Sequence, residues 1–201
     1  MAVAIDADGV RALFPEVDLI ADATLRDAVL AIWIEVGAEC AWARFEDVPK
    51  NLDAEKHRRL VDHVNGVTRM ALALAEIAAR DQGAQVNRDH LIAACLLHDV
   101  SKPLETEPDP HGPPPNGRAL PGRKSAMGDK IQHAVYATHK VFAHGLPLEV
   151  AHIVNTHTHQ SNVRSKTLEG AFLFYADYAD SDACIIPAGG KAFVQRWEIP
   201  H

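Results

Sequence analysis

Cysteine is scarce in this 201-residue sequence, occurring only at Cys40, Cys95 and Cys184. Three widely spaced cysteines form neither a disulfide framework nor a paired-cysteine metal site. The pattern argues against a disulfide-stapled secreted module and fits a reducing compartment, with Cys95 as a small core residue.

Long apolar runs are also missing. No segment reaches the roughly 18 consecutive apolar residues of a membrane-spanning helix. The opening residues MAVAIDADGV lack the basic and apolar regions of a signal peptide. We therefore expect a soluble cytoplasmic protein with no membrane partner.

Positive charge is in deficit. The sequence has 20 Lys and Arg against 27 Asp and Glu, a net charge of -7 with neutral histidines. Proteins that coat nucleic acid need clustered Lys and Arg for phosphate contacts, so we expect no nucleic-acid partner. A small anionic substrate stays compatible with this charge, because a bound cation can outweigh the chain's own charge locally.

Histidine, by contrast, is abundant, with 12 occurrences. It is the commonest metal ligand among side chains and the one that titrates near neutral pH. This abundance raises the expectation of metal chemistry without placing a site.

The apolar pattern is helical almost throughout, and 47% of the residues are hydrophobic, enough for a substantial core. No segment shows convincing strand alternation. The fold class is therefore predicted to be all-α, a single helical-bundle domain. The expected helices span about 21–43, 53–81, 87–99, 129–144, 147–157 and 166–181.

Local signals predict where some of these helices begin, end and pack. Gly83 is expected to stop the second helix, whereas Asn87 and Ser165 are expected to cap the third and the last. Trp33 and Trp42 are expected to anchor the first helix, and the last helix to bury its aromatic side chains Tyr175 and Tyr178. The second helix is expected to bury an apolar side made of Val61, Val64, Val67, Met70, Leu72, Leu74 and Ile77.

Residues 103–125 differ from the rest, with seven prolines and three glycines. No regular element is expected at that density. Long loops in compact domains are often functional, so the segment is either a lid or a solvated insertion. Its basic residues Arg118, Arg123 and Lys124 could close over an anionic substrate or only face solvent.

The stretch CLLHDVSKP, residues 95–103, carries the strongest chemical signal. An apolar run that looks like a buried helix ends in His98-Asp99, and Lys102 follows. Burying such an ionisable pair is costly unless it is paired or bound to a metal. Further candidates lie in or at the end of other expected helices, where a bundle can point them inward: His63, His133, His157 and Asp177.

Three of these choices have a neighbouring competitor. His133 competes with His139, six residues on. His157 competes with His159, and Asp177 competes with Asp180, one helical turn later. We favour the first member of each pair. Lys102 is either a substrate-binding cation or only a solvated lysine at a helix end.

In order and context, this set resembles the HD-domain superfamily of metal-dependent phosphohydrolases, over roughly residues 57–182. The resemblance rests on "LLHDVSK", on "FYADYAD" and on a first histidine, a His-Asp pair, two later histidines and a late aspartate. It implies a helical HD-type fold and a dinuclear site. In that site Asp99 would bridge two ions, and the remaining ligands would be His63, His98 and Asp177 for one ion and His133 and His157 for the other.

The resemblance also implies a reaction. We expect a metal-dependent hydrolase of a small anionic substrate, a phosphate ester, acting through a metal-bound hydroxide, with Asp99 and Lys102 as catalytic residues. Imidazole and carboxylate ligands suit two divalent transition-metal ions drawn from Fe, Mn, Co, Ni and Zn. Two alternatives stay open: a di-iron HD-type oxygenase that oxidises or cleaves a small organic substrate with O2, and a non-catalytic binding or regulatory protein.

The expected organisation has three parts. Residues 1–50 form an N-terminal helical extension packed on the core, and residues 51–182 form the HD-type metal-binding domain. Residues 183–201 form a C-terminal tail that makes a short strand pair or packs on the surface. Apolar bundles of this size often dimerise, so a homodimer is possible.

Overall fold

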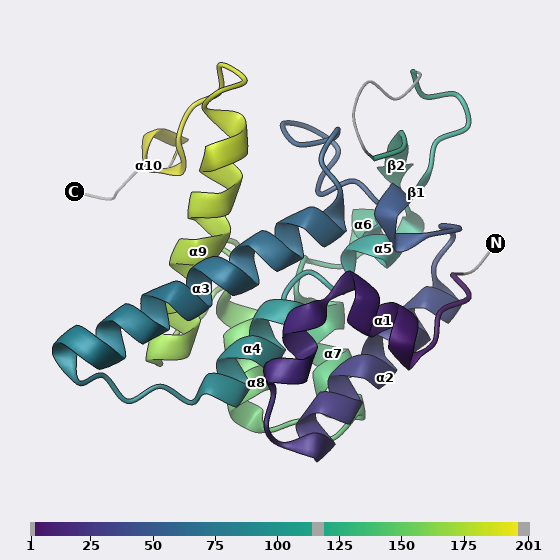
Figure 1. Ribbon diagram of the computed structural model, residues 1–201. Coiled ribbons are helices and arrows are strands. Elements are labelled where there is room, and N and C mark those ends of the chain that lie inside the picture. The colour runs from purple at the N-terminus through teal and green to yellow at the C-terminus, as the bar shows by residue number, and fades with distance from the viewer. Residues whose placement is uncertain (1–2, 114–118, 197–201) are drawn as a thin grey trace.

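The computed structural model describes residues 3–113 and 119–196, and helices dominate them (Figure 1). This confirms the all-α class. The elements are α1 (Ala7–Leu13), η1 (Pro15–Leu19), α2 (Ala23–Glu39), η2 (Phe45–Asp47), α3 (Leu60–Gln82), α4 (Arg88–Leu97), α5 (Lys102–Glu105), β1 (Thr106–Pro108), β2 (Gly122–Lys124), α6 (Ala126–Lys130), α7 (Val135–Ala143), α8 (Leu148–Thr156), α9 (Leu168–Ile185) and α10 (Phe193–Arg196).

Helix α4 is the centre of the bundle. It contacts α2, α3, α8 and α9, and every residue from Leu91 to Leu97 is buried. A helix apolar on all sides can only be stable inside a core. Asn87 caps its start, as predicted, by accepting a hydrogen bond from the backbone N–H of His90. The helix ends at Leu97, so the His98-Asp99 pair that follows lies in the interior.

Helices α3 and α9 pack side by side, and α3 ends at Gly83 in a left-handed conformation, as predicted (Figure 1). The apolar side predicted for α3 was partly wrong. Its large residues Met70, Leu74 and Ile77 are exposed, whereas Ala71, Ala75 and Ala78 are among the buried ones. Small side chains allow close approach to neighbouring helices, so the helix turns its alanines inward.

Helix α3 also begins later than predicted, at Leu60 instead of about residue 53. The preceding residues form a loop that is closed by a bridge between Pro49 and Arg59. The Lys50 backbone N–H donates to the Arg58 carbonyl within this loop, at 2.8 Å. The loop therefore folds back over the start of α3 instead of extending it.

The N-terminal helices share one apolar core with the rest of the bundle. Trp33 of α2 is fully buried between the rings of Phe14 and Phe45, and its Nε1 donates to the Leu96 carbonyl of α4 at 3.1 Å. Trp42 is buried as well. These contacts confirm that Trp33 anchors α2 on the bundle. Trp42 lies beyond the end of α2, and its Nε1 donates to the Thr106 carbonyl at 3.1 Å. The boundaries at residues 50 and 182 stay predictions.

The Pro-rich segment has more regular structure than predicted. Pro103 sits in the first turn of α5, and β1 pairs antiparallel with β2, with Thr106 opposite Lys124. Proline is tolerated in a first helical turn and at strand ends because no N–H is needed there, which explains the wrong prediction. Residues 114–118, including Arg118, lie outside the described residues, so the lid stays a prediction.

The later helices differ from the sequence prediction in three places. Residues 129–144 form parts of two helices, because α6 ends at Lys130 and α7 begins at Val135. Thr167 caps α9 in place of Ser165, accepting from the Gly170 N–H at 3.1 Å. Tyr175 is 63% exposed and is not a core residue, whereas Tyr178 is half-buried.

The described part of the C-terminal tail, up to residue 196, continues α9 to Ile185 and adds the short helix α10. It contains no strand pair, and residues 197–201 lie outside the described residues. Over the same described chain, none of the helices combines the length and the apolar character that crossing a membrane requires.

An ion network joins α2 to α7. The Lys140 ammonium is buried and lies 2.7 Å from Glu35 Oε1 and 2.6 Å from Glu39 Oε1. His144 Nε2 also contacts Glu35. The hydrogen bond from Lys140, followed by that from His144, lowers the pKa of Glu35 from 4.5 to about 2.

This pKa shift predicts how acid acts on stability. Because the folded protein binds the Glu35 proton more weakly than the unfolded chain, the stabilisation is fully present above pH 4.5 and is lost as pH falls towards 2. We expect E35Q to lose about 1 kcal/mol of unfolding free energy at pH 7, a modest value because Glu35 is partly exposed. The stability of E35Q should also fall less steeply than that of the wild type as the pH is lowered. Urea unfolding from pH 7 to pH 3 measures both effects. A loss of the same size in E76Q, an exposed residue of α3, would contradict this assignment.

Candidate metal centre

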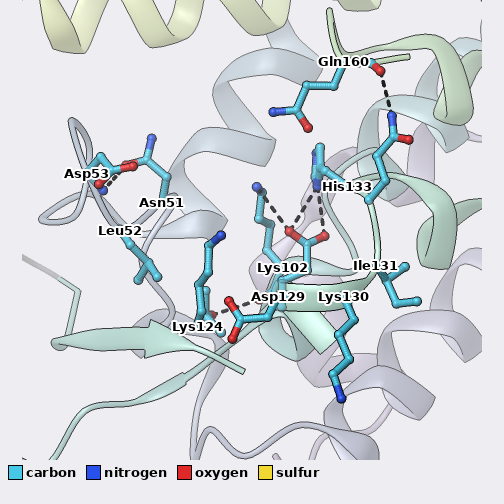
Figure 2. Close-up of a pocket in the computed structure, with 14 residues that line it drawn as sticks. Asn51, Leu52, Asp53, Lys102, Lys124, Asp129, Lys130, Ile131, His133 and Gln160 are labelled. Carbon is cyan, nitrogen blue, oxygen red and sulfur yellow. Dashed lines mark hydrogen bonds and ion pairs between the residues drawn. The ribbon is translucent and has the colours of Figure 1, made fainter. Parts of the chain in front are cut away.

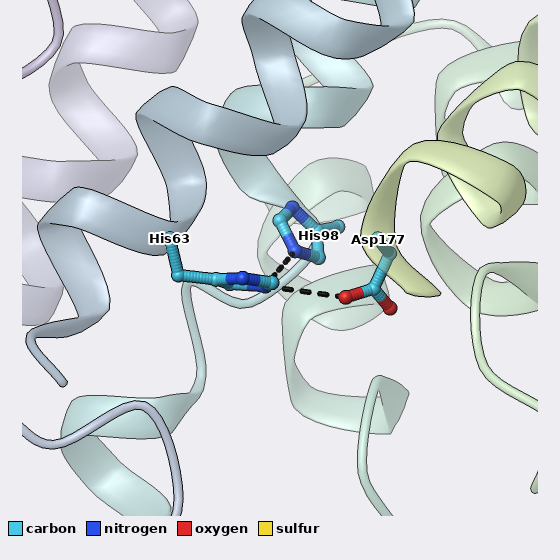
Figure 3. A group of neighbouring side chains, drawn as sticks. All are labelled: His63, His98 and Asp177. Atoms are coloured by element: carbon cyan, nitrogen blue, oxygen red, sulfur yellow. Dashed lines mark hydrogen bonds and ion pairs between the residues drawn. The ribbon is translucent and has the colours of Figure 1, made fainter. Parts of the chain in front are cut away.

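Three of the predicted ligands meet at the middle of the bundle (Figure 3). His63 comes from α3, His98 follows the end of α4, and Asp177 comes from α9. His63 Nε2 lies 3.2 Å from His98 Nε2 and 3.2 Å from Asp177 Oδ1. All three residues are buried, and we call them the first group.

The second group consists of Asp99, His133 and His157. His133 lies between α6 and α7, where Ala134 adopts a left-handed conformation with φ of 74°. His157 follows the end of α8. His133 Nε2 is 3.2 Å from His157 Nε2 and 2.9 Å from Asp99 Oδ1.

Asp99 is a member of the second group that also faces the first. Its Oδ2 is 3.5 Å from His63 Nε2 and 3.7 Å from His98 Nε2, and its Oδ1 faces His133 and His157. Oδ1 is buried and makes no hydrogen bond of acceptable geometry. A buried acceptor without a hydrogen bond costs about 1–3 kcal/mol, so a cation at this position would remove a real penalty.

Two of the four histidines are oriented by their own helices. His98 Nδ1 lies 2.6 Å from the Cys95 carbonyl, and His157 Nδ1 lies 2.6 Å from the Val154 carbonyl. Each histidine stands at the C-cap of its helix, where the last carbonyls have no partner within the helix. A carbonyl can only accept, so the proton resides on Nδ1 and the Nε2 lone pair points into the centre.

The other two histidines are oriented by carboxylates. His63 Nδ1 lies 2.6 Å from Asp180 Oδ2, and His133 Nδ1 lies 2.9 Å from Glu105 Oε1. Metal-binding histidines usually donate their second ring N–H to such a carboxylate or carbonyl, which fixes the tautomer and raises ligand basicity. Each group thus has one histidine backed by a carboxylate and one backed by a carbonyl.

The donor set as a whole suits metal ions. Four Nε2 atoms converge in two pairs, and the two atoms of each pair are 3.2 Å apart. Burial lowers the pKa of His98 to about 4 and that of His157 to about 3, so both rings are neutral at pH 7. Neutral imidazoles and carboxylates facing each other in a dry interior repel unless a cation lies among them. The two groups could therefore hold divalent metal ions.

The competing residues are found in other places. His139 and His159 are exposed and belong to neither group. Asp180 lies behind His63, on the far side of its ring from the first group. The position of Asp180 one turn after Asp177 was a signal for an inward-facing residue, but it did not distinguish a ligand from the partner of a ligand.

Sequence reasoning missed two other residues at the centre. Glu105 accepts from His133, and Lys50 places its Nζ 2.8 Å from Asp99 Oδ2. The closeness of Glu105 to His98-Asp99 in the sequence was a weak signal for a residue at the centre. In the structure, α5 brings Glu105 back towards the centre. Lys50 lies in a loop, where no periodicity marks an inward side chain.

Lys102 does not continue α4. The chain turns after Leu97, and Lys102 opens α5. Its Nζ lies 3.5 Å from Glu105 Oε2, next to His133 (Figure 2). The side chain is therefore held at the edge of the second group, more tightly than a solvated helix-end lysine.

A cavity of about 470 Å³ opens beside this edge (Figure 2). Lys102 and His133 line it, together with Lys124, Lys130 and the amides of Asn51, Gln132 and Gln160. A neighbouring recess of about 290 Å³ reaches both groups and is lined by Lys50, His157, Asp177 and Tyr178, among others. The three lysines of the larger cavity are balanced by the carboxylates of Asp53, Glu105 and Asp129, so a small anionic molecule would contact Lys102 locally, beside the second group.

The setting of Asp180 predicts a role in positioning His63. Arg58 holds its carboxylate at 2.8 Å and 2.7 Å, and a Cβ on Gly66 would collide with Asp180 Oδ1. We expect D180N to weaken metal binding by roughly 10- to 100-fold, since Asn supplies no charge to His63, with helical circular dichroism unchanged. Metal titration measures the effect.

The matched control for D180N is D182N on the same helix. Asp182 accepts from the Phe193 backbone N–H and pairs with Arg196, away from both groups. It should bind metal as the wild type does. Equal metal affinity in D180N and D182N would show that Asp180 has no positioning role.

Comparison with known proteins matches the stretch of chain that contains both groups. The HD domain model matches residues 60–182, the stretch that contains both groups. Dihydroneopterin 2',3'-cyclic phosphate phosphodiesterase of Methanocaldococcus jannaschii is 31% identical over 123 residues, which is 61% of this chain and 46% of that protein. The chain thus spans less than half the length of this relative, and no solved structure matches it. With its family model covering more than half of the sequence, the chain belongs to the HD domain family.

Proposed function

We propose that the protein is a metal-dependent phosphohydrolase of a small phosphate ester. The observation that carries the proposal is the convergence of four histidine Nε2 atoms on either side of one buried carboxylate, Asp99. The related phosphodiesterase supports a phosphate ester as the class of substrate. The position of Lys102 adds support, because its ammonium lies at the edge of the second group, where it could contact a phosphoryl oxygen.

Each ligand has a place in this proposal. Asp99 would bridge two ions, with His63, His98 and Asp177 completing one site and His133 and His157 the other. Two bound divalent ions would supply an activated water near neutral pH and neutralise charge on the phosphoryl group. Fe, Mn, Co, Ni and Zn all suit these ligands.

The protein's own side chains would bind and orient the ester. Lys102, at the edge of the second group, would hold a phosphoryl oxygen and stabilise charge that develops there. Glu105 limits the movement of Lys102 and keeps the His133 proton on Nδ1. The leaving group would extend into the polar cavity beyond Lys102.

The substrate test starts from the relative's chemistry. Its name describes a 2',3'-cyclic phosphate diester, and we propose that phosphate diesters and monoesters of similar size are the first substrates to examine. A cytoplasmic location and a homodimer stay predictions.

The deciding experiment combines metal analysis with an ester screen. Freshly purified protein is analysed by inductively coupled plasma mass spectrometry and assayed on bis-p-nitrophenyl phosphate, p-nitrophenyl phosphate and 2',3'-cyclic nucleotides. We expect bound transition metal, hydrolysis of at least one ester, loss of activity with a chelator and recovery with added metal.

The other functions considered predict different results. Two irons per chain with substrate-dependent O2 uptake and no ester hydrolysis would identify an oxygenase. Failure to bind any of the five metals, even after reconstitution, would indicate a non-catalytic protein. Either outcome would refute the proposed hydrolase.

A further inference from the structure

In the described chain, Lys50 is the one lysine or arginine that ion-pairs with the candidate ligands Asp99 and Asp177. It lies in the loop before α3, outside the part of the chain that matches the HD domain. Its backbone is fixed by the hydrogen bond to Arg58, and its side chain is 11% exposed. A lysine so deeply buried has to be paired with negative charge.

The partners of Lys50 are the carboxylates of Asp99 and Asp177, which both face His63 of the first group. Its Nζ lies 2.8 Å from Asp99 Oδ2 and 3.7 Å from Asp177 Oδ1. These same oxygens face His63 Nε2, at 3.5 Å and 3.2 Å. The ammonium therefore binds the oxygens that an ion in the first group would need.

Among the described residues, no lysine or arginine pairs with the Asp99 oxygen that faces the second group, whose nearest neighbour is His133 Nε2 at 2.9 Å. Asp99 Oδ1, which faces His133 and His157, accepts no hydrogen bond of acceptable geometry. Lys102 pairs with Glu105 and not with Asp99. The two sides of Asp99 therefore differ in one respect that matters to an incoming ion. The carboxylate oxygens that face the first group are paired with a lysine, whereas the Asp99 oxygen that faces the second group is near histidines alone.

We propose that Lys50 is a built-in counter-cation of the first group, which holds Asp99 and Asp177 in place and competes with metal for them. The inference rests on the proposed metal centre. It implies that the two ions bind unequally, with the second group binding first and more tightly. Filling the first group then requires the Lys50 ammonium to withdraw, and the adjoining recess that Lys50 lines offers the space.

The test compares K50M with K50R and with K56M, an exposed lysine of the same loop. Chelator-treated proteins are titrated with Co²⁺ and followed by absorption and calorimetry. We expect two unequal steps in the wild type, K50R and K56M. In K50M the weaker step should tighten by roughly tenfold or more, because the competing cation is gone.

Thermal stability gives a second readout, independent of activity. Without metal, K50M should melt roughly 10 °C below the wild type, since two buried carboxylates lose their partner. Added Co²⁺ should restore most of this loss. If K50M does not fold without metal, the double variant K50M/D177N takes its place. This variant removes one charge of each sign and should recover much of the stability.

The outcomes separate the two proposals. Unchanged or weaker binding at the second step in K50M, or an unchanged melting temperature, would overturn the role of Lys50 while leaving the metal centre intact. Absence of Co²⁺ binding in the wild type would refute the metal centre itself. In that case a lower melting temperature of K50M than of K50R would still show that Lys50 holds the carboxylates.

Discussion

Replacing Asp99 with asparagine should lower ester hydrolysis by at least about 1,000-fold and prevent retention of two ions. Asp99 is the only residue that faces both groups in the described chain, with one carboxylate oxygen directed at each. Asparagine has the same shape but no charge, and its amide nitrogen would turn a donor towards one pair of histidines. Because the side chain keeps its volume, the helical content should stay the same.

The measurement is metal content by mass spectrometry together with hydrolysis of bis-p-nitrophenyl phosphate. D27N, which changes an exposed aspartate of α2, serves as the control and should match the wild type. The substitution also weakens the pairing of Lys50, so D99N should be less stable than D27N without metal. A D99N protein that keeps two ions and its activity would place the metal site elsewhere.

The second large effect concerns stability. W33A should lower the free energy of unfolding by about 3–5 kcal/mol, because it empties a fully buried site in contact with the rings of Phe14 and Phe45. It also leaves the Leu96 carbonyl without the Trp33 Nε1–H, two residues before His98. We therefore expect metal binding to weaken as well.

Urea unfolding of W33A, W33F and Y175A tests this effect. W33F keeps a ring and should cost less than W33A, whereas Y175A removes a ring that is 63% exposed and should stay within about 0.5 kcal/mol of the wild type. Equal stability of W33A and Y175A would show that the N-terminal helices do not share the core with α4.

The position of the candidate metal centre was readable from the sequence because α4 is apolar on every side. A helix of that kind must be central, so the His98-Asp99 pair at its end had to lie inside. The spacing of His63, His133 and Asp177 could not give distances, but each lay beside an apolar stripe that pointed inward. The order of the residues, through the family resemblance, then predicted which ligands share an ion. The structure brings the same residues together in two groups.

Other features depend on information that local patterns lack. Asp177 and Asp180 are one turn apart and both point inward, and only the position of the His63 ring distinguishes them. Lys50 reaches the centre from a loop whose path depends on the bridge between Pro49 and Arg59. On α3, hydrophobicity favoured Met70 and Leu74 as buried residues, yet close packing buried the smaller alanines instead.

The histidine Nδ1–H groups donate either to main-chain carbonyls or to side-chain carboxylates, and these two kinds of acceptor have different evolutionary consequences. The carbonyls of Cys95 and Val154 belong to the main chain, so no point mutation deletes them. Asp180 and Glu105 are side chains, and a single codon change can neutralise or remove either. Descendants of this scaffold can therefore adjust the electron donation of one histidine in each group while the other stays constant. Reactivity can diverge at these two positions with every ligand retained.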